Sequence, residues 1–178
     1  MKWKNYNQEN GCYFVTAALR NFTPLFDERE IVSIVFDSLN FLRRNKGLKI
    51  YAYVVMPEHV HLVASAGEAS ITTLIGDFKR FTSRNIAKWL RVNNPPLLEK
   101  LKADAYRGQN YAVWQETFRS EVIYERKFLV QKIDYIHNNP VRRGLVEEPG
   151  DWRYTSFNQM EGDEGPVAEG LIVDKLDS

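Results

Sequence analysis

Cysteine, histidine and long apolar runs are scarce in this sequence, and these shortages exclude several classes of protein. The single cysteine, Cys12, cannot form an internal disulfide and fits a reducing compartment. No stretch approaches the ~20 consecutive apolar residues of a membrane-spanning helix, and residues 1–7 lack the apolar segment of a secretion signal. We therefore expect a cytoplasmic protein with no membrane partner.

Charge is nearly balanced over the chain but is divided unevenly along it. The net charge is +1, yet residues 1–160 hold 23 basic and 17 acidic residues, whereas residues 161–178 hold six acidic residues and one basic residue. A basic body is compatible with a polyanionic partner without proving one. The length of 178 residues suits one well-buried core. We expect a single domain over residues 1–160 and a flexible acidic tail over 161–178; a tail that competes for the basic surface is the alternative.

Two of the three histidines lie one residue apart in the apolar stretch 54–63. In an extended strand, residues i and i+2 point to the same face, so His59 and His61 present their imidazoles side by side while Val60 and Leu62 point to the packed side. Two neutral imidazoles at this separation can share one divalent cation. The alternative is that both are solvent-facing strand residues without a function.

The order of apolar patterns along the chain predicts the fold. Branched and aromatic residues predict strands over 13–19 and 48–55, a third strand that carries the two histidines, and a fourth from Tyr111 towards Val122. Helical spacing predicts helices over 27–45, 70–90 and 125–138, the last ended by Asn139 and Pro140. Residues 92–110 break the second helix and show no clear pattern. The order β-α-β-β-α-β with an added C-terminal helix predicts an α+β, ferredoxin-like (split βαβ) fold, in which one antiparallel sheet carries both main helices on one face.

The predicted helix 125–138 presents polar groups at regular spacing. Gln131, Tyr135 and Asn139 fall at i, i+4 and i+8, on a different face from the apolar stripe of this helix. A phenol and an amide oxygen are thereby held one turn apart on a rigid element. Because a helical tyrosine more often serves packing, this pattern alone does not identify a nucleophile.

Three motifs can be read together. They are Pro57-Glu58-His59-Val60-His61, the run 134–146 that contains Tyr135-Ile136-His137-Asn138-Asn139-Pro140-Val141, and Asp151-Trp152 with Ser156. Together they resemble the REP-associated tyrosine transposases, a branch of the HUH single-strand DNA transposases within the IS200-like family. An HxH motif alone is weak, but its combination with the tyrosine motif at this distance is specific. The motifs span residues 57–156, and the order of elements agrees from about residue 13.

The resemblance implies a metal-dependent single-strand DNA endonuclease and transposase. It implies that His59, His61 and Asn139 bind a divalent cation, Mg²⁺ or Mn²⁺, which mixed nitrogen and oxygen ligands without a thiolate suit. Tyr135 is the implied nucleophile, which would form a 5′-phosphotyrosine link and leave a 3′-OH for rejoining. The implied partner is single-stranded or hairpin DNA related to repetitive extragenic palindromes, so the bound protein would lie at the bacterial nucleoid.

Candidate DNA contacts follow from charge and aromaticity. The expected phosphate contacts are the basic side chains of the second helix and of the segment after the tyrosine helix, namely Lys79, Arg80, Arg84, Lys88, Arg142 and Arg143. Trp152 is an expected platform for an unpaired base. The alternative for the helical charges is a solvated face. Glu58 either orients a metal ligand or is an ordinary turn carboxylate. His137 points away from the phenol and is interpreted as structural or as a base contact.

Two other functions fit the same residues. A metal phosphodiesterase that uses water as its nucleophile would need the histidines but not Tyr135. A non-catalytic DNA-binding module for palindromic hairpins would need neither. The DNA sequence bound, the rejoining of strands, and the choice between monomer and homodimer are left open by the sequence.

Overall fold

The computed structural model describes residues 11–103, 111–162 and 171–175. Within them, four strands form one antiparallel sheet in the order β2-β3-β1-β4. They are β1 (Cys12–Ala18), β2 (Leu48–Met56), β3 (His59–Ala66) and β4 (Arg119–Ile123). The burial of β1 alternates residue by residue, as expected of a strand with one densely packed face.

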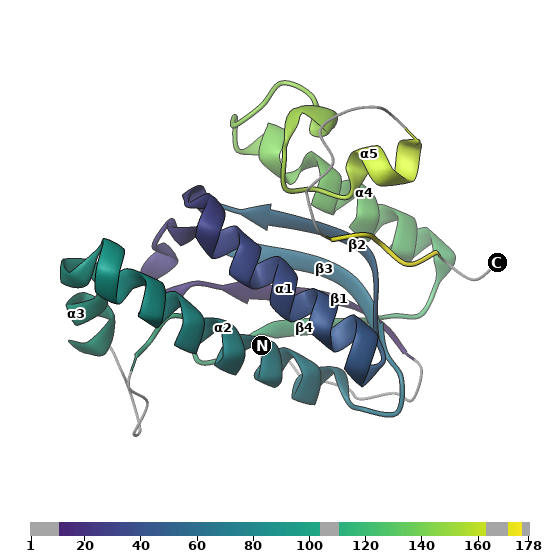
Figure 1. The fold of residues 1–178 in the computed structure, drawn as a ribbon. Helices are drawn as coiled ribbons and strands as arrows, with labels where there is room; N and C mark the ends of the chain where they lie inside the picture. The colour runs from purple at the N-terminus through teal and green to yellow at the C-terminus, as the bar shows by residue number, and fades with distance from the viewer. Residues whose placement is uncertain (1–10, 104–110, 163–170, 176–178) are drawn as a thin grey trace.

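Two long helices, α1 (Arg29–Lys46) and α2 (Ile71–Asn93), lie side by side over one face of the sheet (Figure 1). Their apolar stripes and the inward side chains of the strands form the main core. The ends of these helices follow local chemistry. Gly47 ends α1 in the left-handed region at φ 72°, and the Ser70 hydroxyl caps α2 by accepting from the Thr73 amide. The ferredoxin-like prediction is therefore confirmed.

The helix α4 (Arg126–Arg142) packs on the opposite face of the sheet, against β2 and β3. Its buried Ile136 meets a second apolar cluster that includes Val54 and Val63. The prediction that this helix ends at Asn139 and Pro140 is wrong, because the helix continues through Pro140. The proline lies in the last turn, where it removes only one helical hydrogen bond, and Gly144 at φ 67° ends the run.

Several connections differ from the sequence-based expectations. The segment 92–110 contains a further helix, α3 (Pro95–Ala103), which begins with proline at a position where no amide partner is needed. Strand β4 starts at Arg119, and Trp114 makes only an isolated bridge to Leu19. Short helices complete the fold: η1 (Arg20–Phe22), η2 (Leu25–Asp27), η3 (Pro149–Asp151) and α5 (Phe157–Glu161).

The end of the chain covers the outer edge of β2. Residues 154–156 pair with Tyr53 and Val55, and Asp174 exchanges hydrogen bonds with the backbone of Ile50. The Arg43 guanidinium donates to both carboxylate oxygens of Asp174 at 2.9 Å. Within the expected acidic tail, residues 171–175 thus pack against the body of the protein: Leu171 is fully buried, and Asp174 pairs with the partly buried Arg43. Residues 163–170 and 176–178 lie outside the described part.

No helix in the described residues combines the length and apolarity needed to cross a membrane.

Candidate active site

Strand β3 places the two histidines on the face covered by α4. The Nε2 atoms of His59 and His61 lie 3.0 Å apart, and the two ring centroids are separated by 4.6 Å. His61 is paired in the sheet with Thr16 on one side and Val54 on the other. The imidazoles thus converge through the same ring nitrogen, which is an arrangement suited to a shared cation.

The other ring nitrogen of each histidine has its own partner. Thr16 Oγ1 lies 2.8 Å from His61 Nδ1, and Glu58 Oε1 lies 3.2 Å from His59 Nδ1. Because a carboxylate only accepts, Glu58 favours the His59 tautomer with the proton on Nδ1 and a lone pair on Nε2. Arg143 donates to the same Glu58 oxygen at 2.7 Å. Such partners orient metal-ligating imidazoles and increase their basicity.

Both histidines are held in the neutral form. Burial, together with the neighbouring His59 and the Lys132 ammonium, lowers the pKa of His61 to about 3. Burial also lowers the pKa of His59, although Glu58 partly offsets this effect. Neutral imidazoles keep a lone pair for a cation at neutral pH.

Helix α4 brings Tyr135 against this pair. Its ring meets His61 edge-on at a centroid distance of 5.4 Å and Phe14 at 5.8 Å, and 37% of Tyr135 is exposed. The Arg142 guanidinium lies 5.2 Å from the ring centroid. Within the described residues the Tyr135 hydroxyl has no hydrogen-bond partner. It lines a hollow of about 330 Å³, hereafter the Tyr135 hollow, together with Phe14, Thr16, His61, Arg119, Ser120, Glu121 and Lys132.

Asn139 lies on the same stripe of α4, one turn beyond Tyr135. Tyr135 contacts His61, and Arg143 contacts the carboxylate beside His59, so the intervening Asn139 faces the histidine pair as well. Asn139 is 6% exposed, and its carboxamide makes no hydrogen bond to the part of the chain that the structure describes. Two imidazole nitrogens and an unengaged amide oxygen make a donor set that fits Mg²⁺ or Mn²⁺. The set includes an amide because the described residues contain no group of three or more His, Cys, Asp or Glu side chains that could hold a metal ion.

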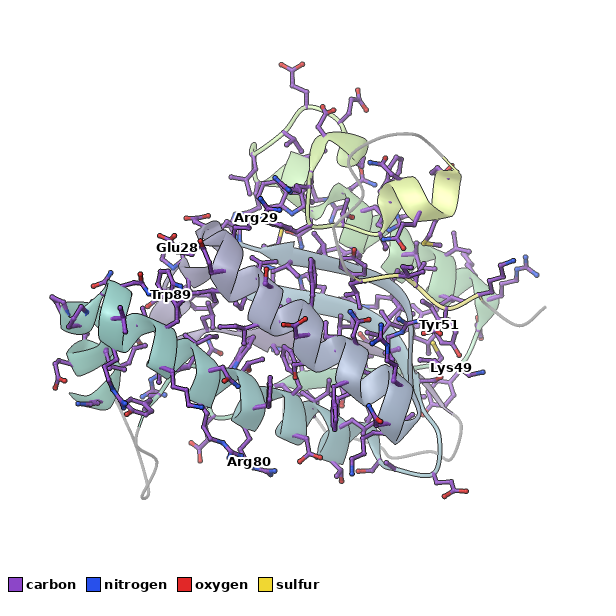
Figure 2. All side chains as sticks on the ribbon, viewed as in Figure 1. Glu28, Arg29, Lys49, Tyr51, Arg80 and Trp89 are labelled. Carbon is purple, nitrogen blue, oxygen red and sulfur yellow. The ribbon has the colours of Figure 1, made fainter. Side chains whose placement is uncertain are left out.

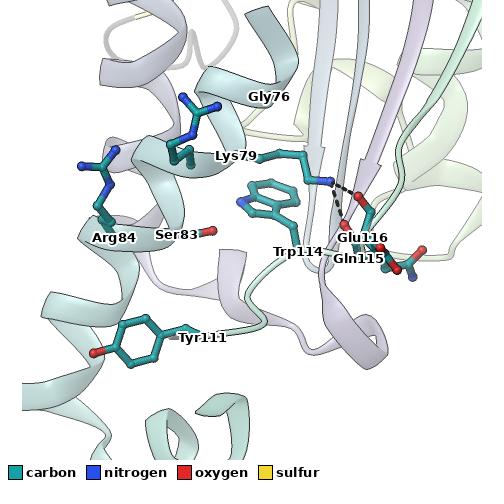
Figure 3. A pocket seen from close by; sticks show the side chains of 9 residues that line it. Gly76, Lys79, Ser83, Arg84, Tyr111, Trp114, Gln115 and Glu116 are labelled. Atoms are coloured by element: carbon teal, nitrogen blue, oxygen red, sulfur yellow. Dashed lines mark hydrogen bonds between the residues drawn. The ribbon is translucent and has the colours of Figure 1, made fainter. Parts of the chain in front are cut away.

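The expected DNA contacts of α2 lie on the other side of the sheet from this site. Lys79 donates to the backbone oxygens of Gln115 and Glu116 at 2.7 and 3.1 Å (Figure 3), and burial lowers its pKa to about 8. Arg80 reaches outward from α2 and pairs with Asp77 at 2.7 Å (Figure 2). The structure therefore does not bring these basic residues to the histidines and Tyr135.

The other two expected DNA contacts on α2, Arg84 and Lys88, are exposed and make no ion pair with any described residue. Arg84 lines a second hollow of about 420 Å³, between α2 and residues 111–116. Arg84 points away from Trp114 in Figure 3. This surface is basic but separate from the site.

The expected contacts near the C-terminal half of α4 lie close to the site. Arg142 covers the Tyr135 ring and Arg143 holds Glu58, so both have local partners. Trp152 donates from its indole to the Val55 oxygen at 3.0 Å, and its half-buried ring packs against α4, which limits its use as a base platform. His137 is buried, with Nε2 2.9 Å from Ser156 Oγ, in agreement with the structural interpretation.

Sequence reasoning missed two polar residues of the site, Thr16 and Arg119. Both lie opposite His61 in the same cross-strand row, since Thr16 pairs with His61 and with Arg119. Thr16 alternates with the apolar Val15 and Ala17, which was the available signal for it, whereas Arg119, between Phe118 and Ser120, shows no such pattern. Alternation alone does not say which strands are adjacent, so it could not place them beside the histidines.

A match to a known family places this fold and site in a class of DNA-processing enzyme. Residues 20–139, which include both histidines, Tyr135 and Asn139, match the family model described as "Transposase IS200 like". The chain belongs to this transposase family.

Its relatives make the resemblance more specific. The chain is 27% identical over 174 residues to the REP-associated tyrosine transposase of Escherichia coli. This alignment covers 96% of the present chain and 87% of the relative. A relative from Haemophilus influenzae is 28% identical over 167 residues, or 87% and 86% of the two chains. The fold is similar to the solved structure of a REP-associated tyrosine transposase bound to a REP hairpin, at a TM-score of 0.70, 22% identity, and coverage of 100% and 94%.

Proposed function

We propose that this chain cuts single-stranded DNA beside a REP-like hairpin through a covalent link to Tyr135, and that it can rejoin the strands. The observation that carries the proposal is the contact between Tyr135 and His61 in an open hollow, where the two histidine Nε2 atoms converge at 3.0 Å. A phenol on a rigid helix, a pair of neutral imidazoles and access for a DNA strand coincide there.

The cutting step uses Tyr135 as the nucleophile. Tyr135 Oη forms a bond to the phosphorus of one phosphodiester while the bond between phosphorus and O3′ breaks. The products are a 5′-phosphotyrosine and a 3′-OH, and the proton lost by the phenol is balanced by the one gained at O3′. Because the new ester keeps the phosphoryl bond, a second 3′-OH can attack it, release Tyr135 and join two strands without a nucleotide cofactor.

The surroundings of Tyr135 support this role. The Arg142 guanidinium packs against the phenol ring at 5.2 Å from its centroid and so helps to hold the ring in place. Phe14 and His61 fix the ring from two other directions, which reduces the freedom that the attack must overcome.

His59, His61 and Asn139 are the proposed ligands of a divalent cation. A cation of this kind would polarise the phosphodiester and offset the negative charge that develops on its oxygens. Thr16 and Glu58 hold the imidazoles with their Nε2 atoms directed inward. Arg143 fixes Glu58 from the end of α4, so the helix that carries the nucleophile also orients a ligand on β3.

The proposed substrate class comes from the relatives. The curated relative in Escherichia coli is named for its association with REP sequences, and a REP hairpin is bound in the similar solved structure. Tyr135 is 37% exposed at the edge of the Tyr135 hollow, so a DNA strand can reach the nucleophile.

The test uses hairpin oligonucleotides with single-stranded flanks, chosen from the genome around the gene and labelled at either end. They are incubated with Mg²⁺ or Mn²⁺, with or without EDTA, and separated on a denaturing gel. We expect a metal-dependent protein adduct on the fragment with the 5′-phosphate, and none with Tyr135→Phe. Tyr154→Phe is the matched control, because Tyr154 is also half-buried but meets Phe36 of α1 and packs against the main core, outside the hollow.

Two outcomes would replace this proposal. If the wild type cleaves the DNA without forming an adduct, and Tyr135→Phe still cleaves it, the nucleophile is water. Tight hairpin binding without cleavage under any metal condition would indicate a non-catalytic DNA-binding module.

A further inference from the structure

Part of the sheet face beside His61 is left open by α4. The helix lies mainly against β2 and β3 and reaches β4 through the ion pair between Lys132 and Glu121, so Thr16 on β1 stays partly exposed and Arg119 on β4 stays exposed beside the histidine pair. The row across this surface runs from His61 through Thr16 to Arg119, all pointing to the same side because they are direct pairing partners. All three residues of this row line the Tyr135 hollow.

Two cations line the Tyr135 hollow, and their situations differ. Lys132 is engaged, with Nζ 2.8 Å from Glu121 Oε2 and 4.5 and 4.7 Å from the ring centroids of Phe14 and Phe128. Arg119 is exposed and makes no ion pair or side-chain hydrogen bond to any described residue. The hollow therefore has one guanidinium available for an anion.

The spacing suits a phosphate between Arg119 and the histidines. Adjacent strands of a sheet are ~4.8 Å apart, so the Cα atoms of His61 and Arg119, two strands apart, are separated by about 10 Å. Side chains that rise from the same face enclose a space between them, and Tyr135 overhangs it from α4. Guanidinium groups bind phosphate oxygens in a bidentate manner.

We propose that Arg119 is a catalytic residue that binds the phosphodiester attacked by Tyr135, on the side of the hollow away from the histidines. This inference rests on the proposed function, because it assigns the scissile phosphate a second contact. Arg119 neutralises charge on the non-bridging oxygens as the phosphoryl group passes from O3′ to the tyrosine oxygen. It also fixes the path of the strand over β1 and β4, so it determines which phosphate reaches the nucleophile.

The first test measures chemistry. Arg119→Gln is expected to slow adduct formation about 100-fold, because removal of one preorganised donor to developing charge has effects of this order. The matched control is Arg44→Gln, since Arg44 is an exposed arginine on α1, on the other face of the sheet. The control is expected to react at the wild-type rate. Both variants are expected to melt as the wild type does, because neither side chain is buried.

The second test identifies the phosphate. In the Tyr135→Phe background, hairpin binding is measured with an ordinary oligonucleotide and with one that carries an uncharged methylphosphonate at the cleavage position. Arg119→Gln is expected to weaken binding of the ordinary DNA about tenfold and to have no effect on the methylphosphonate DNA. An equal loss with both DNAs would place Arg119 at another phosphate and overturn the inference.

The failures of the two proposals can be told apart. If the wild type forms a Tyr135-dependent adduct and Arg119→Gln reacts equally fast, the inference about Arg119 alone is wrong. If the wild type forms no adduct with any hairpin, the proposed function is wrong, and the inference falls with it.

Discussion

The carboxylate beside His59 offers a sharp test of the proposed metal site. Glu58 is 6% exposed, and one of its oxygens meets both His59 Nδ1 at 3.2 Å and Arg143 at 2.7 Å. Glu58→Gln keeps the size of the side chain but removes the charge that favours the Nδ1-protonated imidazole and balances Arg143. We expect Mn²⁺ binding to weaken 10- to 100-fold, the range typical of lost partners of metal-ligating histidines.

The same substitution should change folding very little. The Arg143 side chain is 51% exposed, so water can take over the guanidinium once the carboxylate is gone. The free energy of unfolding should therefore fall by no more than about 1 kcal/mol. A large loss of metal affinity with nearly unchanged stability distinguishes an orienting role from a structural one.

Isothermal titration with Mn²⁺, without DNA, measures the affinity directly, and urea unfolding measures the stability. Glu147→Gln is the control, because Glu147 is exposed and makes no contact with the histidines. Equal Mn²⁺ affinities for the wild type and Glu58→Gln would refute the reasoning, as would an equal loss in the control.

Three further predictions concern stability and the placement of Lys79. Burial raises the pKa of Asp174, but the hydrogen bonds from Arg43 and the Ile50 amide outweigh burial and lower this pKa below its ordinary value of 3.8. Asp174→Asn should therefore cost about 2 kcal/mol of unfolding free energy at pH 7, a value between those of exposed and buried ion pairs. In urea titrations, the difference from the wild type should begin to shrink only below the ordinary pKa and should vanish below the lowered one. Burial lowers the pKa of His137 to about 4, so unfolding free energy should decline from pH 6.5 to 4 because the unfolded chain takes up the proton first; a decline of equal slope in His137→Gln would contradict this. Lys79→Met should lower the melting temperature while leaving Tyr135 adduct formation at the wild-type rate, and a selective loss of hairpin binding would show that Lys79 contacts DNA.

Local spacing was enough to predict the part of the site that each element carries by itself. The i, i+2 spacing placed His59 and His61 on one face of β3, and the i, i+4 spacing placed Tyr135 and Asn139 on one stripe of α4. Both are properties of a single strand or helix, which the sequence determines directly. The ferredoxin-like order of elements followed from the same periodicities.

Contacts between elements could not be predicted in this way. The position of Thr16 beside His61 depends on which strands are neighbours and in which register, and neither is visible in local alternation. In the sequence, Lys79 belongs to a row of basic residues along one helix. In the structure, its ammonium donates to the backbone carbonyls of residues 115 and 116, which are distant in sequence. Pro140 reads as a helix end, although its place in the last turn lets α4 continue to Arg142.

The composition of the acidic tail likewise does not predict its contacts with the rest of the chain. Its charge predicts a solvated segment, yet Leu171 and Asp174 attach it to β2 and α1 through one buried side chain and one ion pair. Two residues among many are enough to fix a short segment, and an average over 18 residues conceals them.

The most direct test of the central claim is to locate the DNA on the protein. After reaction with a hairpin oligonucleotide and Mn²⁺, the adduct is digested with trypsin and a nuclease, and the modified peptide is sequenced by mass spectrometry. We predict a nucleotide joined through its 5′-phosphate to Tyr135, in the peptide that also contains Asn139. A modification on any other residue, or cleaved DNA with no modified peptide, would contradict the account.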